Sequence, residues 1–324
     1  MTWNERVAQV QQHGFTERQA GFLVTVMLHA GVCLMRHYEA FARMRHGQTI
    51  IDFFQSLVTR GYATANPCGH HRAHLYHLHF KPLYRAIGEP DNRHRRPTAL
   101  PRAVEKLMVL DAVLADRDRT WLATEWEKVA HFTLTHQLAR RDLPSLTFRA
   151  GDAETVRYFP DKLPIGLNGD RPYTFMYLAT QETPMDFRGF LERHAELFRS
   201  LPSWRVRLLV PEHMRTAIPF YEAAFAEQLA SPLRPALVDD LRWYFEARRA
   251  ARVGPHERFD QTARAFSAPR FQALYRAWIE RGDRVLDASM SPTLAEAMAR
   301  KTGQLEVHVL AHRYLHLGRL VGTA

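Results

Sequence analysis

The chain has 324 residues, 46% hydrophobic and 24% charged, which is typical of a globular protein and long enough for two or three domains. No apolar run approaches the roughly 18 to 20 residues that span a bilayer, and two cysteines are too few for a disulfide scaffold. The net charge of +10 favours a polyanionic partner, but it comes mostly from arginines spread over the whole chain, a bias that genomic base composition also produces.

The first residues give an expectation about location. The segment Met1–Arg6 lacks a charged-then-apolar signal pattern. We therefore expect a cytoplasmic protein without a membrane partner.

Three helices are predicted at the start of the chain. Thr16 and Gln19 have the spacing of a capping box before a helix with apolar residues at helical intervals, and Arg36–Arg43 fits a second, short helix. A third helix follows Gly47 and ends at Gly61. Its expected buried stripe is apolar and consists of Ile50, Phe53, Phe54, Leu57 and Val58.

A basic, histidine-rich hairpin follows the third helix. Tyr62–Ala65 fits a strand, Asn66–Gly69 a turn, and His74–His79 an alternating return strand. Three short helices followed by such a hairpin are typical of a winged helix-turn-helix, so residues 1–90 are predicted to form a DNA-binding domain of this kind.

This arrangement assigns contacts to particular residues. Polar residues of the third helix would lie along the major groove, and they are Gln48, Thr49, Asp52, Gln55 and Thr59. Basic residues would contact phosphates or the minor groove, and they are Arg45, Arg60, His70, His71 and Arg72. The Asp52 carboxylate argues against DNA contact, because it would repel phosphates unless it finds a hydrogen-bond donor. The alternative is a winged helix that binds protein.

Cysteine and histidine side chains crowd into the hairpin. The group consists of Cys68, His70, His71, His74, His77 and His79. Their spacing fits no compact zinc finger, so we expect no metal and a solvated surface that faces phosphates. Protonation of these histidines near pH 6.5 would then strengthen polyanion binding in acid.

The N-terminal segment, about residues 14–88, resembles the winged-helix part of the plasmid replication-relaxation family. The resemblance rests on Thr16-Glu-Arg18-Gln19, Arg60-Gly61-Tyr62 and Arg72-Ala-His-Leu-Tyr76-His-Leu78. The family's usual glycine shortly after the last strand is replaced here by Lys81-Pro-Leu-Tyr84. The resemblance implies a DNA-binding winged helix followed by an inactive domain of the restriction-endonuclease type.

The rest of the chain is predicted to be a mixture of α+β and α/β structure. Pro90–Pro101 has the composition of a linker, and residues 91–140 are expected to form a helical linker region. Residues 141–231 alternate strands and helices, as in an α/β domain, and residues 232–324 are mainly helical.

The α/β segment resembles, more weakly, the core of restriction-endonuclease-like folds. Those cores place Pro-Asp on one strand and Glu-x-Lys on the next, and the carboxylates hold Mg²⁺. Pro160-Asp161 supplies the first element, but Tyr173–Gln181 carries neither acid nor lysine, and Glu182 comes late. We expect an inactive scaffold, because a nuclease would need Asp161, Lys162 and Glu182 to converge.

The combined prediction is a sequence-specific double-stranded DNA-binding protein of a mobile element. It would act in plasmid replication or mobilisation or in transcription regulation, without catalysis, cofactor or metal. Homodimer formation is expected from the two-fold symmetry of DNA half-sites, and replication or mobilisation proteins are candidate partners. The alternatives are a metal-dependent nuclease centred on Asp161 and a protein-interaction scaffold.

Overall fold

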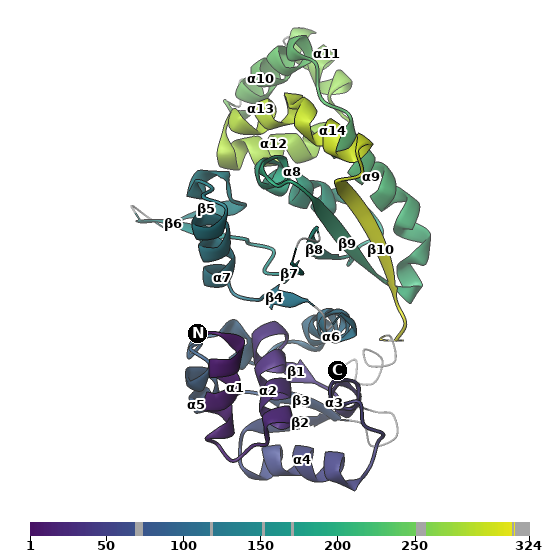
Figure 1. Cartoon of the computed structure of the whole chain (residues 1–324). Helices are drawn as coiled ribbons and strands as arrows, with labels where there is room; N and C mark the ends of the chain where they lie inside the picture. Colours follow the sequence, from purple (N-terminus) through teal and green to yellow (C-terminus); the bar gives the residue numbers. More distant parts are fainter. Residues whose placement is uncertain are drawn as a thin grey trace. The chain divides into compact units, whose positions relative to one another are not determined.

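The protein is described by a computed structural model that covers residues 1–68, 74–116, 119–150, 153–169, 172–250, 257–312 and 314. It is a mixed α+β protein, and it divides into two compact units (Figure 1). The first unit comprises Met1–Arg119 and the residues from Leu310 onward, and the second comprises Thr120–Val309. Both ends of the second unit therefore connect to the first, and the segments 91–140 and 232–324 each divide between the units.

The first unit places short helices around a small sheet. Its elements in chain order are α1 Trp3–Gln11, α2 Glu17–His29, β1 Val32–Cys33, α3 Met35–Ala42, α4 Gln48–Thr59, β2 Ala63–Pro67, β3 His74–Leu78, α5 Lys81–Ala86, the 3₁₀ turn η1 Arg93–Arg95 and α6 Leu100–Ala115. The sheet is antiparallel with the order β1-β3-β2, so β3 is central.

The ends of the first helices form as the sequence predicts. The Thr16 side chain accepts from the Gln19 amide, and the Gln19 side chain accepts from the Thr16 amide (3.0 Å), which completes the capping box of α2. Helix α4 ends at Gly61, which has a φ of +69°. The Tyr62 amide donates to the Leu57 carbonyl oxygen (2.8 Å), as in a Schellman motif.

The three-stranded sheet is covered on both faces. On one face the Tyr76 ring lies 4.4 Å from the Phe54 ring of α4, measured between centroids. On the other face the His77 imidazole donates to the His94 carbonyl oxygen of η1 (3.1 Å). Residues 75–78 of β3 are consequently all buried, although His77 among them is polar.

The segment expected to be a linker, Pro90–Pro101, is packed in place by this contact. Its His94 is 4% exposed. Its backbone lies against Gly31, where a Cβ atom would stand 2.3 Å from the His94 carbonyl oxygen and where φ is +70°. Only glycine fits at that position, because a side chain would be both strained and in collision.

Asp111 of α6 holds the first turn of α3. Both carboxylate oxygens pair with the Arg36 guanidinium (2.5 and 2.8 Å), and His37 Nε2 lies 3.1 Å away. The Tyr314 hydroxyl, from the segment after the last strand, also donates to Asp111. Burial alone would raise the pKa of Asp111, but its contacts with His37 and Arg36 outweigh burial and hold the pKa well below the usual range.

The second unit joins a five-stranded sheet to a helical layer. Its elements are β4 Thr120–Leu122, α7 Glu125–Ala130, the π-helical turn η2 His131–Thr135, η3 Arg140–Asp142, β5 Ser145–Ala150, β6 Ala153–Tyr158, β7 Ile165–Leu167, β8 Tyr173–Leu178, α8 Met185–Ser200, β9 Trp204–Pro211, η4 Glu212–Ala217, α9 Ile218–Ala230, α10 Pro235–Arg249, α11 Glu257–Ala265, α12 Pro269–Arg281, α13 Arg284–Met290, α14 Pro292–Ala299 and β10 Gly303–Leu310.

The sheet of the second unit has the order β10-β9-β8-β7-β4, and β5 and β6 form a separate hairpin. Strands β8 and β9 are parallel and are connected by α8, which packs on the sheet. The Phe198 ring of α8 stacks on the Trp204 ring of β9, with centroids 4.2 Å apart. This pair lies in the main apolar core of the unit.

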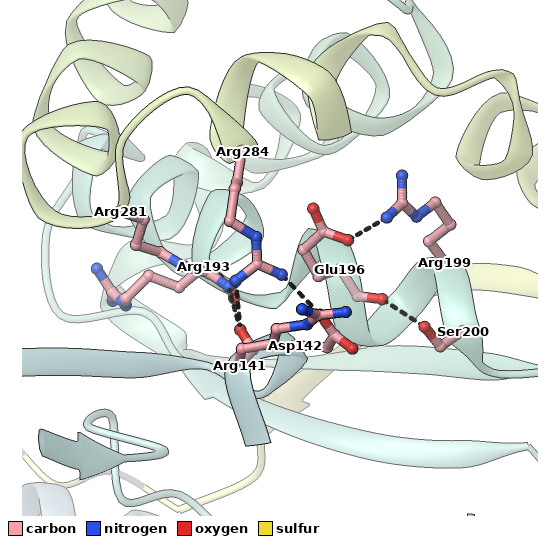
Figure 2. Close-up of polar contacts among 8 residues, drawn as sticks. All are labelled: Arg141, Asp142, Arg193, Glu196, Arg199, Ser200, Arg281 and Arg284. Carbon is pink, nitrogen blue, oxygen red and sulfur yellow. Dashed lines mark hydrogen bonds and ion pairs between the residues drawn. The ribbon is translucent and has the colours of Figure 1, made fainter. Parts of the chain in front are cut away.

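Arginine side chains of α12 and α13 attach these two helices to α8 and η3 (Figure 2). The Arg284 guanidinium donates to the Arg141 carbonyl oxygen (3.0 Å) and to Asp142 (2.6 Å). The Arg281 guanidinium donates to the carbonyl oxygen of Arg193 (2.9 Å). The Arg141 carbonyl lies in the short turn η3, whereas the Arg193 carbonyl lies inside α8 and accepts the Arg281 guanidinium as an additional donor. These charge-assisted hydrogen bonds attach α12 to α8 and α13 to η3.

Glu192 is buried where α8 packs against α12. The residue is 6% exposed. Burial raises the pKa of the Glu192 carboxyl to about 7, although the positive charges of Arg270, Arg188 and Arg281 oppose the rise. The folded chain therefore keeps a proton on Glu192 between about pH 4.5 and 7, whereas the unfolded chain releases it. The free energy of unfolding falls as pH rises through this window.

Replacing Glu192 by glutamine should remove that loss of stability. Glu192→Gln is expected to match the wild type at pH 5 and to exceed it at pH 8 by up to about 3 kcal/mol in unfolding free energy. Urea unfolding at both pH values measures the difference, with the exposed Glu222→Gln on α9 as the control. Equal stabilities at pH 8, or a weaker variant, would contradict this account of Glu192.

In the part of the chain that the structure describes, no helix combines the length and the apolar character that a membrane crossing requires.

Candidate nucleic-acid interface

Helix α4 presents a polar face to solvent. Its inner residues Ile50, Phe53, Phe54 and Leu57 are buried, whereas Val58, expected among them, is 39% exposed. The residues of the outer face are all exposed, as the sequence predicts. We call the set for which base contact is predicted the base-contact face, and it consists of Gln48, Thr49, Asp52, Gln55 and Thr59.

Three side chains of the base-contact face remain available for external hydrogen bonds. Gln55 and Thr59 are one turn apart on the same side of α4, and Thr49 lies nearer the start of the helix. None of the three has a hydrogen-bond partner among the described residues. Hydroxyl and amide groups both donate and accept, so these residues can pair with base edges in a groove as wide as the major groove.

Asp52 has the donor that its position requires. The Gln48 side-chain amide donates to the Asp52 carboxylate (2.6 Å), one helical turn away. The pair uses one of the two N–H donors of the Gln48 amide, and it leaves the second N–H and the carbonyl oxygen available. Gln48 therefore acts on Asp52 first, and its predicted role in contacting bases is narrower than that of Gln55.

Arg60 is exposed but already engaged within the first unit. Its guanidinium donates to the His13 carbonyl oxygen and to the Tyr62 hydroxyl (2.8 Å). It also stacks over the rings of Phe15 (4.9 Å) and Tyr62 (4.5 Å). Arg60 thus fastens the end of α4 to the loop before α2, a role that the prediction of a phosphate contact did not include.

Arg45 has a different environment. No hydrogen bond or ion pair of its side chain is found within the described residues, and it precedes α4 by three positions. Arg43, which the sequence-based assignment missed, is also exposed and ends α3 with a φ of +53°. The basic run Arg43-Met-Arg45-His46 directly before Gly47 was the signal that could have identified it.

The predicted hairpin contacts fall partly outside the described residues. His70, His71 and Arg72 lie there, between β2 and β3. Of the described histidines, His77 is buried rather than solvated, because η1 covers its face of the sheet. Burial lowers the pKa of His77, so acid does not readily add a charge at this position.

The cysteines and metal-ligating side chains form no metal site within the described ranges. Cys33 and Cys68 are both free and buried. No group of three or more histidine, cysteine, aspartate or glutamate side chains is placed there to hold a metal ion.

The residues of the nuclease alternative do not come together. Asp161 pairs with Arg193 of α8 (2.7 Å) and lines a cavity of only about 10 Å³ together with Lys162. Glu182 is exposed beyond the end of β8, and it does not line that cavity. A two-carboxylate Mg²⁺ site with room for a DNA strand would need a different arrangement.

Comparisons with known proteins give no relative. No family model matches the chain, and neither a curated protein nor a solved structure matches it. Function must therefore be argued from the residues and their geometry.

The contrast between Arg60 and Arg45 can be measured by unfolding. Arg60→Ala should lower the unfolding free energy of the first unit by about 1 to 3 kcal/mol, since it removes charged hydrogen bonds and ring contacts. Arg45→Ala should change it by less than about 0.5 kcal/mol. Urea unfolding of both variants measures these changes in unfolding free energy. An equally small change for Arg60→Ala and Arg45→Ala would show that Arg60 has no structural role.

Proposed function

We propose that the first unit is a winged helix-turn-helix that binds double-stranded DNA, with α4 in the major groove. The observation that carries the proposal is the base-contact face, where Thr49, Gln55 and Thr59 are exposed and unpaired beside a fully apolar inner face.

The order of elements supports the same proposal. After α2 the chain passes through β1, α3, α4, β2 and β3, and the three strands form one antiparallel sheet. Winged helices share this order, in which the third helix enters the groove and the hairpin follows the backbone. The exposed Arg43 and Arg45 stand where the strands of a duplex would flank the start of α4.

The second unit enters the proposal as a partner-binding part and not as an enzyme. Asp161 is held by Arg193, so it is not presented as a metal ligand. The proposed process is plasmid replication or mobilisation, or transcription regulation, in a mobile element, with two copies bound to paired half-sites. Light scattering of the complex on a selected duplex tests the pairing, and a single bound copy would refute it.

The test of DNA binding begins with selection from a random duplex library. Gln55→Ala should weaken binding to the selected duplex by about 10- to 100-fold and leave binding to an unrelated duplex unchanged, because one bidentate base contact is lost. Arg45→Ala should weaken binding to both duplexes alike and reduce the salt slope by about one. Fluorescence anisotropy titrations at several salt concentrations provide these values.

Two matched variants in the second unit serve as controls. Gln261→Ala on α11 and Arg140→Ala in η3 remove exposed side chains of the same types, and neither should change DNA affinity. No enrichment of any duplex, or equal effects of Gln55→Ala and Gln261→Ala, would refute the proposed function.

A further inference from the structure

A groove of about 800 Å³ opens on the first unit among α1, α2 and α3 and reaches the start of α4. Aromatic side chains from α1 and α3 line it together with polar residues of α2. Its size is within the range of small-molecule sites, which combine an apolar wall with a few polar groups that orient the ligand.

The apolar wall is formed by two rings that meet above a glycine. A Cβ atom on Gly21 would lie 3.3 Å from Phe41 Cζ and 3.8 Å from Trp3 Cζ2. Trp3 nevertheless remains 44% exposed. A large aromatic surface left open beside a second ring offers a place for a planar ligand to stack.

The polar part of the groove has two donors. The Tyr38 residue is 4% exposed and its ring packs on Phe53 (4.7 Å between centroids), yet its hydroxyl has no hydrogen-bond partner among the described residues. Arg18 Nη1 lies 3.3 Å from Met44 Sδ, a weak acceptor. Both residues line the groove. Burial raises the pKa of the Tyr38 hydroxyl, and the positive charge of Arg18 opposes the rise.

We propose that this groove binds a small planar aromatic anion. The ring of the ligand lies against Trp3 and Phe41, and its negative group accepts hydrogen bonds from Arg18 and from the Tyr38 hydroxyl. Glu17 is also in the lining, so the site favours a single negative charge over a polyphosphate or a nucleic acid strand.

The groove also has a connection to α4. Thr49 of the base-contact face lines it, so a bound ligand would touch the helix that is proposed to enter DNA. An effect of the ligand on DNA binding through this contact rests on the proposed function, whereas binding of the ligand itself does not. The binding test therefore uses the full chain without DNA, and its failure is distinguishable from a failure to bind DNA.

Two fluorescent probes separate the ring contacts from the anion contacts. Anilinonaphthalene sulfonate is an aromatic monoanion, and phenylnaphthylamine has the same rings without the sulfonate. Both should bind the wild type saturably, with energy transfer from Trp3. Arg18→Gln and Tyr38→Phe should each weaken sulfonate binding about tenfold and leave the uncharged probe unchanged. Trp3→Ala should weaken both probes.

The controls are Arg140→Gln and Trp126→Ala, which alter exposed residues of the second unit and should change neither affinity. Retained binding of the uncharged probe shows that Arg18→Gln and Tyr38→Phe keep the groove folded. The proposal is overturned if sulfonate binding is absent, if it survives all three groove variants, or if Arg18→Gln weakens both probes equally.

Discussion

The partly buried carboxylate of Asp111 joins three segments of the first unit, and the placement of α3 depends on it. It joins α6 to the first turn of α3 through Arg36 and His37, and it also receives the Tyr314 hydroxyl. Charge-assisted hydrogen bonds are among the stronger polar contacts, and loss of the partners would leave this carboxylate poorly solvated. The loop of residues 43–47 connects α3 to α4, so the anchored α3 also restrains the start of α4.

A second constraint follows from the small size of the sheet. Three short strands cannot bury a core alone, so helices cover one face and η1 with α6 covers the other. The outer side of α4 is exposed, and Thr49, Gln55 and Thr59 there have no hydrogen-bond partner among the described residues. Arg60 attaches the end of α4 to the loop before α2.

Local patterns in the sequence were sufficient for most elements near this face. The capping box of Thr16, the glycine at position 61 and the apolar stripe of α4 depend only on neighbours within a few residues, and all three are present, except that Val58 of the stripe is exposed. The contact between His77 and His94 joins residues that are 17 positions apart and separated by helix α5. No periodicity signals such a contact, so the histidine looked solvated and its partner segment looked like a linker.

The central claim is that Gln55 contacts bases, and a change of specificity tests it most directly. Arginine at a base-contacting position pairs with guanine. Selection from a random duplex library should be carried out with the wild type and with Gln55→Arg. The two selected motifs should differ at a single base pair, and that pair should contain guanine in the motif of the variant. An unchanged motif, or a change produced equally by Gln261→Arg on α11, would contradict the claim.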